Sequence, residues 1–287
     1  MQALSSSSKP VRAPSIWLGG LACFMAIYLP MYWQSLHGLW EREEHAHGPL
    51  ILMIVLWLFW QVRAELQQAS DDGEQSSLGW LPLGAGLALY LLGSLLTFPI
   101  LAFLSQPLVA LGLLLLLGGT RAVKISWFPL FFLMFMVPLP GVLVDMATGA
   151  LKQWVSVIAE WVLRVTGYPV GRTGVTLVVG PYQLLVADAC SGLHSMFTLT
   201  AMGMLFMHIR ARASVVHNGL MLIAILPIAF AANIFRVMAL VLITYHLGDE
   251  AGRGFLHGAA GVFLMVAALL AFIAYDSFLA LFTSKKR

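Results

Sequence analysis

Charged residues are scarce in this sequence. Asp, Glu, Lys and Arg make up 10% of its 287 residues, whereas hydrophobic residues make up 60%. Soluble globular domains carry about 25% charged residues, so the composition excludes an ordinary soluble domain. The formal net charge is only +3, and the basic residues flank apolar runs as they do in membrane proteins. We therefore expect no nucleic-acid partner.

Cysteine is also scarce, which excludes a framework of disulfide bridges. The chain has two cysteines. Cys23 lies in the middle of the first apolar run and is expected to pack as a small hydrophobic residue. Cys190 is expected at a membrane boundary, so no disulfide between the two is predicted. No small-residue cleavage site follows the first apolar run, which we interpret as a retained membrane anchor.

Long apolar runs, by contrast, are abundant. A helix needs roughly 20 apolar residues to cross about 30 Å of hydrocarbon. Eight runs approach this length, at about 15–34, 47–62, 78–97, 100–118, 122–138, 189–209, 214–247 and 255–282. We predict an all-α polytopic membrane protein with about eight transmembrane helices. A single integral-membrane domain would span 15–283, between a flexible N-terminus at 1–14 and a basic tail at 284–287.

The positions of lysine and arginine predict an orientation. Short cytoplasmic loops are enriched in both residues, and eight spans would place both termini on one side. That side holds ten of the 16 lysines and arginines, against five on the other side. We therefore expect cytoplasmic termini, with Cys190 and His257 at the outer face.

Two segments of the outer face differ from the spans. From about 142 to 166, polar residues recur every three or four positions, which predicts an amphipathic helix in the membrane interface. Glu160 and Arg164 are spaced to pair on this helix. From about 174 to 188, two alternating apolar runs flank a Gly-Pro pair, which predicts a β-hairpin. An open sheet edge is costly in lipid, so the hairpin should lie outside the hydrocarbon.

The hairpin leads into the stretch VADACSGLHSMF, which contains Cys190. At the start of a helix, unpaired N–H groups and the helix dipole lower the pKa of a thiol. Asp188, Ser191 and Gly192 flank the cysteine, and the small neighbours would let a substrate backbone approach. Position alone, however, favours a buried structural cysteine.

Arg236 interrupts an otherwise apolar run, FAANIFRVMALVLITYHLG. A charge inside a membrane is costly, so Arg236 should face protein or water. It precedes Leu247 by 11 residues, which predicts a depth of about 16 Å below the outer end of its span. The alternative is a structural ion pair, but Asp276, the only acidic residue inside a predicted span, lies near the opposite end.

His257 opens the last span on the outer face. A lone histidine there is often only an interfacial residue, but this one shares a face with Cys190 and Arg236. The three side chains together can carry out acyl transfer. The thiolate would attack an amide carbonyl, the histidine would protonate the leaving amine, and the arginine would stabilise the thiolate or the oxyanion.

The remaining histidines do not predict a metal site. His45 and His47 form an H-x-H pair, but no acidic residue or thiol lies at a recognised ligand spacing. We expect no metal and no cofactor. His208 and His217 flank a cytoplasmic loop and are expected at the level of the lipid headgroups.

Several motifs resemble the exosortase/archaeosortase family. ADACSG begins a span, NIFR lies within a later span, and HG opens the last span. EHAHGPLI, near the second span, is similar to an early SHG element of the family, with Ala46 in place of the serine and His47 retained. The resemblance covers about residues 40–270, and ACSGLHSMF looks most like the B-type bacterial exosortases.

This resemblance implies a cysteine protease and transpeptidase of the bacterial inner membrane, with its active site at the periplasmic face. Cys190 would be the nucleophile, Arg236 the stabilising cation and His257 the acid/base, with Asn233 orienting the arginine. The substrates would be exported proteins with a PEP-CTERM signal: a Pro-Glu-Pro-like motif, a transmembrane helix and a basic tail. Water or a surface nucleophile, an amine or a hydroxyl, would then resolve the thioester.

A different class of protein remains open. In a small-molecule transporter, Arg236 would bind an anionic substrate and Cys190 would only pack. Transporters are often built from inverted repeats, and the sequence shows no convincing internal repeat.

Overall fold

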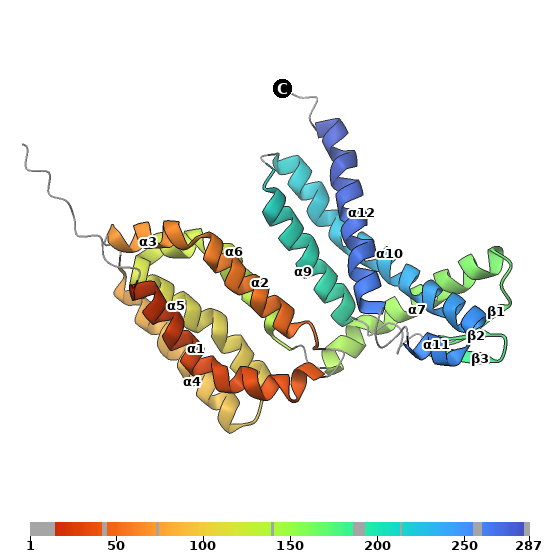
Figure 1. Ribbon diagram of the computed structural model, residues 1–287, viewed down its shortest axis with the longest axis horizontal. Coiled ribbons are helices and arrows are strands. Elements are labelled where there is room, and N and C mark those ends of the chain that lie inside the picture. Colours follow the sequence, from red (N-terminus) through yellow and green to blue (C-terminus); the bar gives the residue numbers. More distant parts are fainter. Residues whose placement is uncertain are drawn as a thin grey trace, which may run out of the picture. The chain divides into compact units, whose positions relative to one another are not determined.

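The computed structural model describes residues 15–41, 45–72, 75–138, 141–185, 193–212, 214–254 and 260–283. The chain forms two compact units, which meet in the sequence between Pro138 and Leu139. Both units are mostly helical, and the described strands all belong to the second (Figure 1).

The first unit is built from helices, in the residues that the structure describes. They are α1 (Ser15–Leu36), η1 (Leu39–Glu41), α2 (Gly48–Gln61), α3 (Arg63–Asp71), η2 (Ser77–Gly79), α4 (Trp80–Leu95), α5 (Pro99–Ile125), α6 (Trp127–Leu133) and η3 (Met134–Met136). Glycines bring α4 and α5 close together, since a Cβ on Gly93 would lie 2.6 Å from the backbone nitrogen of Ala102. Small residues serve the same purpose at helix contacts in membranes generally.

Buried hydrogen bonds join α1 to α5. The Tyr28 hydroxyl lies 2.7 Å from Ser105 Oγ, and the Tyr32 hydroxyl donates to Gln106 Oε1 at 3.0 Å. All four side chains are buried. Because an unsatisfied polar group is expensive in an apolar interior, these pairs specify how the two helices meet.

The predicted number of eight spans is not confirmed. Among the described residues, five helices are long and apolar enough to cross a membrane, or six if α2 and α3, bent by 53°, form one span. The run at 122–138 contains only a short apolar helix at Trp127–Met136, which rises about 15 Å, half the hydrocarbon thickness. Part of that run belongs to α5, which continues to Ile125.

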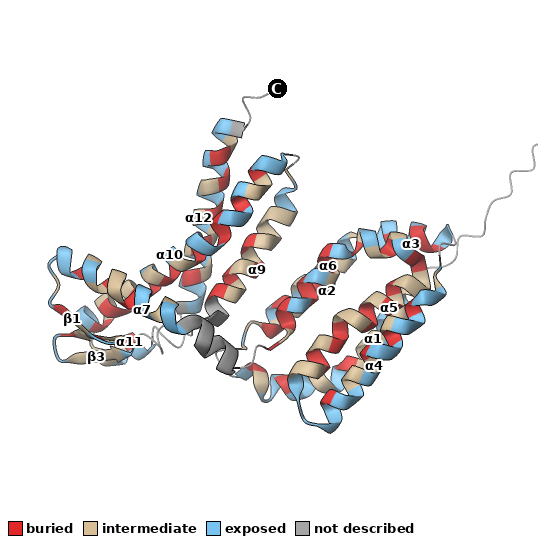
Figure 2. Cartoon of the chain, turned by 180° about the vertical axis from the view of Figure 1, so that it is seen from behind, coloured by how far each residue is buried: buried red, intermediate tan, exposed pale blue. Residues whose placement is uncertain are grey.

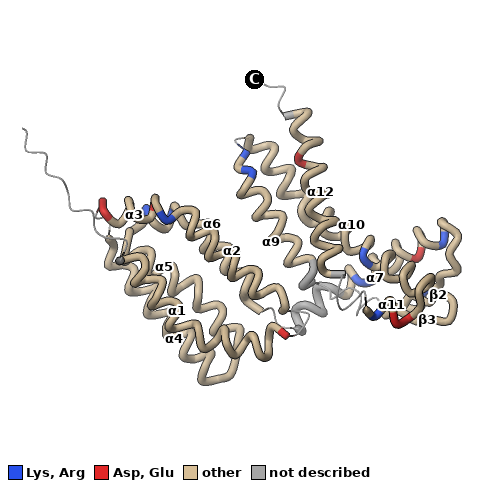
Figure 3. Tube along the Cα trace, in the orientation of Figure 1, with Lys and Arg blue, Asp and Glu red and all other residues tan. Residues whose placement is uncertain are grey.

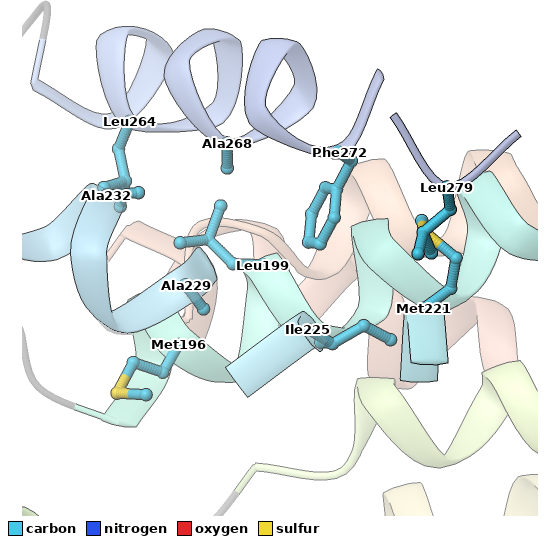
Figure 4. Packing of buried hydrophobic residues seen from close by; sticks show 10 residues of the cluster. All are labelled: Met196, Leu199, Met221, Ile225, Ala229, Ala232, Leu264, Ala268, Phe272 and Leu279. Carbon is cyan, nitrogen blue, oxygen red and sulfur yellow. The ribbon is translucent and has the colours of Figure 1, made fainter. Parts of the chain in front are cut away.

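The second unit is organised around α10. Its elements are α7 (Gly141–Val165), β1 (Val170–Thr173), β2 (Thr176–Val179), β3 (Tyr182–Leu185), α9 (Leu193–Arg210), α10 (Val215–Leu247), α11 (Asp249–Gly254) and α12 (Ala260–Thr283). The first part of α10 packs between α9 and α12. The cluster that joins these three helices consists of Met196, Leu199, Met221, Ile225, Ala229, Ala232, Leu264, Ala268, Phe272 and Leu279 (Figure 4).

The last part of α10 packs against different elements, α7 and the sheet. The second cluster consists of Val155, Ala159, Leu163, Val170, Leu177, Val179, Val237, Leu240 and Val241. Figure 2 shows buried positions recurring along α10. One helix therefore links a bundle of helices to a mixed layer of helix and sheet.

The predicted hairpin is confirmed as β2 and β3, which pair antiparallel across Gly180 and Pro181. Leu177 and Val179 face the core and are fully buried, as their alternation predicts. The structure adds β1, which pairs with β2 and completes a three-stranded meander. The residues at 186–188, included in the predicted hairpin, lie outside the described residues.

The predicted amphipathic helix is confirmed as α7. Its buried face contributes to the second cluster, while Trp154 and Trp161 are 61% and 65% exposed. The predicted pair forms, with Arg164 Nη2 donating to Glu160 Oε1 at 2.9 Å. Arg172 Nε also donates to this carboxylate, at 3.2 Å, and so ties β1 to α7. The location of α7 in the membrane interface stays a prediction.

Candidate active site

The structure describes three of the predicted site residues. Asn233 and Arg236 lie on α10, and His47 immediately precedes α2 in the first unit. The other predicted residues, Asp188, Cys190, Ser191, Gly192 and His257, lie outside the described residues. Their flanking elements are described: β3 ends at Leu185, α9 begins at Leu193, α11 ends at Gly254 and α12 begins at Ala260.

Arg236 is buried at the junction between the two clusters of the second unit. Its exposed fraction is 5%, and that of Asn233, three residues earlier on the same helical face, is 4%. Ala232 belongs to the helical cluster and Val237 to the cluster with the sheet. A buried guanidinium is costly unless it is compensated, and Arg236 is not without a partner, so its position depends on more than apolar packing.

The length of α10 changes the expected depth of Arg236. Its 33 residues rise about 50 Å, more than the roughly 30 Å of hydrocarbon. Val237, Leu240 and Val241 pack against the sheet and α7, and a sheet edge is not tolerated in lipid. If the sheet lies outside the hydrocarbon, as the sequence predicts, α10 leaves the hydrocarbon near Arg236, and this arginine lies at a smaller depth than the about 16 Å expected with Leu247 as the membrane boundary. The depth of Arg236 stays a prediction.

Asp276, on α12, pairs with groups at the opposite end of α10. Arg212 Nε and Nη2 donate to its two carboxylate oxygens at 2.7 Å each, and Arg210 Nη2 donates at 3.1 Å. His217 Nε2 lies 2.8 Å from Asp276 Oδ1. Figure 3 shows basic positions at the end of α9 and an acidic position on α12. The hydrogen bond to Asp276 raises the pKa of Arg212.

This network removes Asp276 as an ion-pair partner for Arg236. His217 and Arg236 are 19 residues apart on α10, which corresponds to about 28 Å along the helix. The His217 side chain is 1% exposed and contacts Asp276, so it packs against protein, and its depth at the lipid headgroups stays a prediction. Sequence reasoning missed this contact because the partners are 59 residues apart.

Three helices that carry or follow the predicted motifs converge in the helical cluster. Met196 of α9, Ala232 of α10 and Leu264 of α12 are all members. Figure 4 shows these three toward one end of the cluster, and Met221 and Leu279 toward the other. The ends of α9, α10 and α12 that meet here are thus the start of α9, the region of α10 before Arg236, and the start of α12.

Each of these three packed residues is close in sequence to one predicted catalytic residue. Cys190 precedes Met196 by six residues. Arg236 follows Ala232 by four residues, and His257 precedes Leu264 by seven. The packing therefore brings together the described segments next to all three motifs.

The early motif has a clear packing role in the first unit. A Cβ on Gly48 would collide with the indole ring of Trp40, which is 7% exposed. Glycine is required at this position because the helix begins directly against that ring. Ala46 is exposed, so the hydroxyl that the serine of the family would add is not needed inside this unit.

An aromatic group at the end of α10 was not predicted from the sequence. The rings of Tyr168, Tyr245 and His246 lie edge to face, with centroids 5.0 to 5.7 Å apart. The Tyr168 hydroxyl is 3.2 Å from His246 Nε2. Because Tyr168 precedes β1, this contact fastens the start of the sheet to α10. Among the described residues, no group of three or more His, Cys, Asp or Glu side chains could hold a metal ion.

Comparisons with known proteins agree with the sequence motifs. No curated protein and no solved structure matches the chain. The family described as transmembrane exosortase (Exosortase_EpsH) matches residues 39–274, a region that contains every predicted catalytic residue. This match covers most of the 287 residues, and the chain therefore belongs to the transmembrane exosortase family.

Proposed function

We propose that this exosortase cleaves sorting signals of exported proteins through a thioacyl intermediate on Cys190. Membership of the family indicates a membrane protease or transpeptidase that sorts proteins. The nucleophile, the substrate signal and the orientation in the inner membrane are our proposals. The observation that carries them is the shared packing of Met196, Ala232 and Leu264, each of which is close in sequence to one predicted catalytic residue.

Chain lengths permit the proposed site. Cys190 is five residues beyond Leu185, the last residue of β3, and five residues span at most about 18 Å. Leu184 of β3 packs against the cluster that contains Val237, the residue after Arg236. These chain lengths support a proposed site in which the thiol, held between the end of β3 and the start of α9, approaches the guanidinium of Arg236.

The proposed reaction follows from the three side chains. Cys190 Sγ, as the thiolate, attacks the carbonyl carbon of the scissile peptide bond, and Arg236 stabilises the resulting oxyanion. The C–N bond breaks, the leaving amine takes a proton from His257, and a thioester remains on Cys190. Water, or an amine or hydroxyl at the cell surface, then attacks the thioester and returns the proton to the site.

The proposed substrate suits a site near the membrane boundary. A signal with a transmembrane helix would diffuse laterally to the enzyme, and its Pro-Glu-Pro-like motif would leave the hydrocarbon at the level of Arg236. Its basic tail would remain in the cytoplasm, by the rule that orients the enzyme itself. The proposed topology has both termini in the cytoplasm and the sheet at the periplasmic face.

A co-expressed substrate tests the proposal. We expect Cys190→Ala to abolish cleavage of a protein that ends in such a signal, while the variant still inserts into the membrane. Cys23→Ala is the matched control, since it removes the other, exposed cysteine and should leave cleavage unchanged. Mass spectrometry should also detect an acyl product linked to Cys190. Normal processing by Cys190→Ala would contradict the proposal and favour a binding or transport role for Arg236.

A further inference from the structure

The first unit contains an apolar cavity that the proposed reaction does not use. Its volume is about 480 Å³, and its walls come from α1, α2, α3, α5 and α6. Phe24, Val55 and Leu114 are representative of the lining, which is almost entirely aliphatic and aromatic. A volume of several hundred cubic ångströms with apolar walls is typical of sites for small hydrophobic ligands.

One end of this cavity is polar and aromatic. Trp17 lies in the first turn of α1, Trp60 in the last turn of α2, and Arg63 at the start of α3, and all three line the cavity. The Arg63 guanidinium lies 4.2 Å from the centre of the Trp60 ring, and its Nη1 donates to the Trp60 carbonyl at 2.6 Å. Tryptophan beside a basic residue is typical of the membrane–water interface.

The polar end keeps hydrogen-bond donors available for a ligand. A guanidinium has five N–H donors. Glu65 is only two residues away in the sequence, yet Arg63 forms no ion pair among the described residues. The nearby acid Asp72 pairs with Arg121 instead. The buried indole N–H of Trp17 also has no hydrogen-bond partner in the described part of the chain.

One side of the cavity is open within the first unit, and we assign this side to the lipid. Leu18, Leu21 and Leu56 line it and are also 61%, 47% and 38% exposed. On helices that qualify as membrane spans, α1 among them, exposed leucines face lipid tails. A ligand can therefore enter sideways from the bilayer without crossing water.

The size and charge of the cavity distinguish between its possible occupants. One turn of helix, about 10 Å across and 5.4 Å long, fills roughly 400 Å³, so the cavity would hold only about one turn of a substrate helix. A basic substrate tail would also be repelled by Arg63. A narrow acyl chain with an anionic headgroup fits both the apolar walls and the cation.

We propose that this cavity binds one acyl chain of an anionic phospholipid, with the lipid phosphate beside Arg63. The site is separate from the proposed catalytic residues, and it would tie a resident lipid to the α1–α2–α5 contact. The lipid belongs to the leaflet on the side of Arg63, which is the cytoplasmic leaflet in the proposed topology.

Native mass spectrometry of the full chain in mild detergent tests this proposal. Titration with palmitoyl-oleoyl phosphatidylglycerol should show one lipid retained at collision energies that remove the others. Phosphatidylcholine with the same chains should bind about fivefold more weakly, as expected for one basic side chain near an anionic headgroup. Arg63→Ala should abolish this preference, whereas Lys124→Ala, which removes an exposed charge from the end of α5, should preserve it.

Bulky substitutions test the cavity itself. Leu113→Trp fills its wall and should reduce retention of both lipids at least about fivefold. Leu56→Trp, at the exposed mouth, is a second variant that tolerates extra volume if Leu113→Trp does not fold. Leu91→Trp, on the exposed face of α4 and outside the cavity, should change nothing.

Two results would overturn the proposal. Equal retention of the two lipids by the unmodified protein, or unchanged retention by both cavity variants, would mean that only annular lipid binds. A photo-crosslinker at position 56 that captured the transmembrane helix of a co-expressed substrate, instead of lipid, would assign the cavity to the substrate.

Discussion

Two regions of α10, near its start and around Arg236, both bury polar side chains, but their surroundings differ. Near its start, His217 faces Asp276, whose carboxylate also accepts hydrogen bonds from Arg210 and Arg212. Farther along, Arg236 is buried at the junction of two clusters, where the elements next to the predicted motifs converge.

The comparison separates a structural role from a proposed catalytic one. Near the start of α10, Asp276 of α12 is surrounded by basic groups from α9, from α10 and from the segment between them. This network therefore holds α9, α10 and α12 together. Asp276 cannot pair with Arg236, because it is bound to Arg212 and His217 near the start of α10. The first set of charges should therefore govern stability, and the second should govern cleavage.

The largest effect is expected from Asp276→Ala. Removing the carboxylate leaves the buried His217 without its partner and two partly exposed arginines without their acid, which should cost about 3 kcal/mol of unfolding free energy, at the lower end for a broken buried pair. Thermal unfolding in detergent and abundance in the membrane measure this loss. Cleavage per folded molecule should remain within about twofold of the unmodified protein.

Ser277→Ala is the matched control for that prediction. Ser277 is adjacent in sequence but exposed, and its hydroxyl donates only to the Ile273 carbonyl within α12. The unfolding free energy of the Ser277→Ala variant should hardly change. If Asp276→Ala were as stable as Ser277→Ala, the network would contribute nothing to stability, and the proposed difference between the two regions of α10 would be contradicted.

The next effect is expected from Arg236→Lys. The substitution keeps the charge but loses the planar, multiple-donor guanidinium, so cleavage should fall about 100- to 1,000-fold, as when an oxyanion donor is removed. Initial cleavage rates of a co-expressed or purified substrate measure this loss. Arg210→Lys is the control, and it should retain cleavage. A lysine variant with half the normal rate would show that only packing or charge matters at this position.

The smallest effect is expected from Glu160→Gln on α7. Glu160 is bonded to Arg164 and Arg172 and is 18% exposed. Because partly exposed ion pairs contribute little, the loss should be about 1 kcal/mol or less, measured by thermal unfolding. Glu250→Gln on α11, an exposed position, is the control. A loss as large as that of Asp276→Ala would contradict the distinction between buried and exposed pairs.

Local periodicity predicted parts of the second unit well. The helix predicted at about 142–166 corresponds to Gly141–Val165, and the pair between Glu160 and Arg164 forms as its spacing suggests. The turn at Gly180 and Pro181 was also predictable, since glycine tolerates the φ of 56° observed there. These features depend on residues a few positions apart.

Other features could not be read from neighbouring residues. β1 contains Gly171 and Arg172 and has no alternating apolar pattern, so its strand conformation depends on pairing with β2. The predicted number of spans is not confirmed, in part because hydropathy does not show where a helix ends, as at Ile125. The candidate site was found from motifs alone, and its geometry at Cys190 and His257 stays a prediction.

The sequence by itself determined that this is a polytopic membrane protein of the exosortase type, because composition and short motifs are local properties of the chain. It also singled out Arg236 as costly in an apolar run. Only the tertiary structure decided the partners of Asp276 and the surroundings of Arg236, because both depend on segments far apart in sequence. The structure also packs the sheet beyond Arg236 on α10, and because lipid cannot satisfy the backbone at a sheet edge, the proposed site is assigned to the membrane boundary.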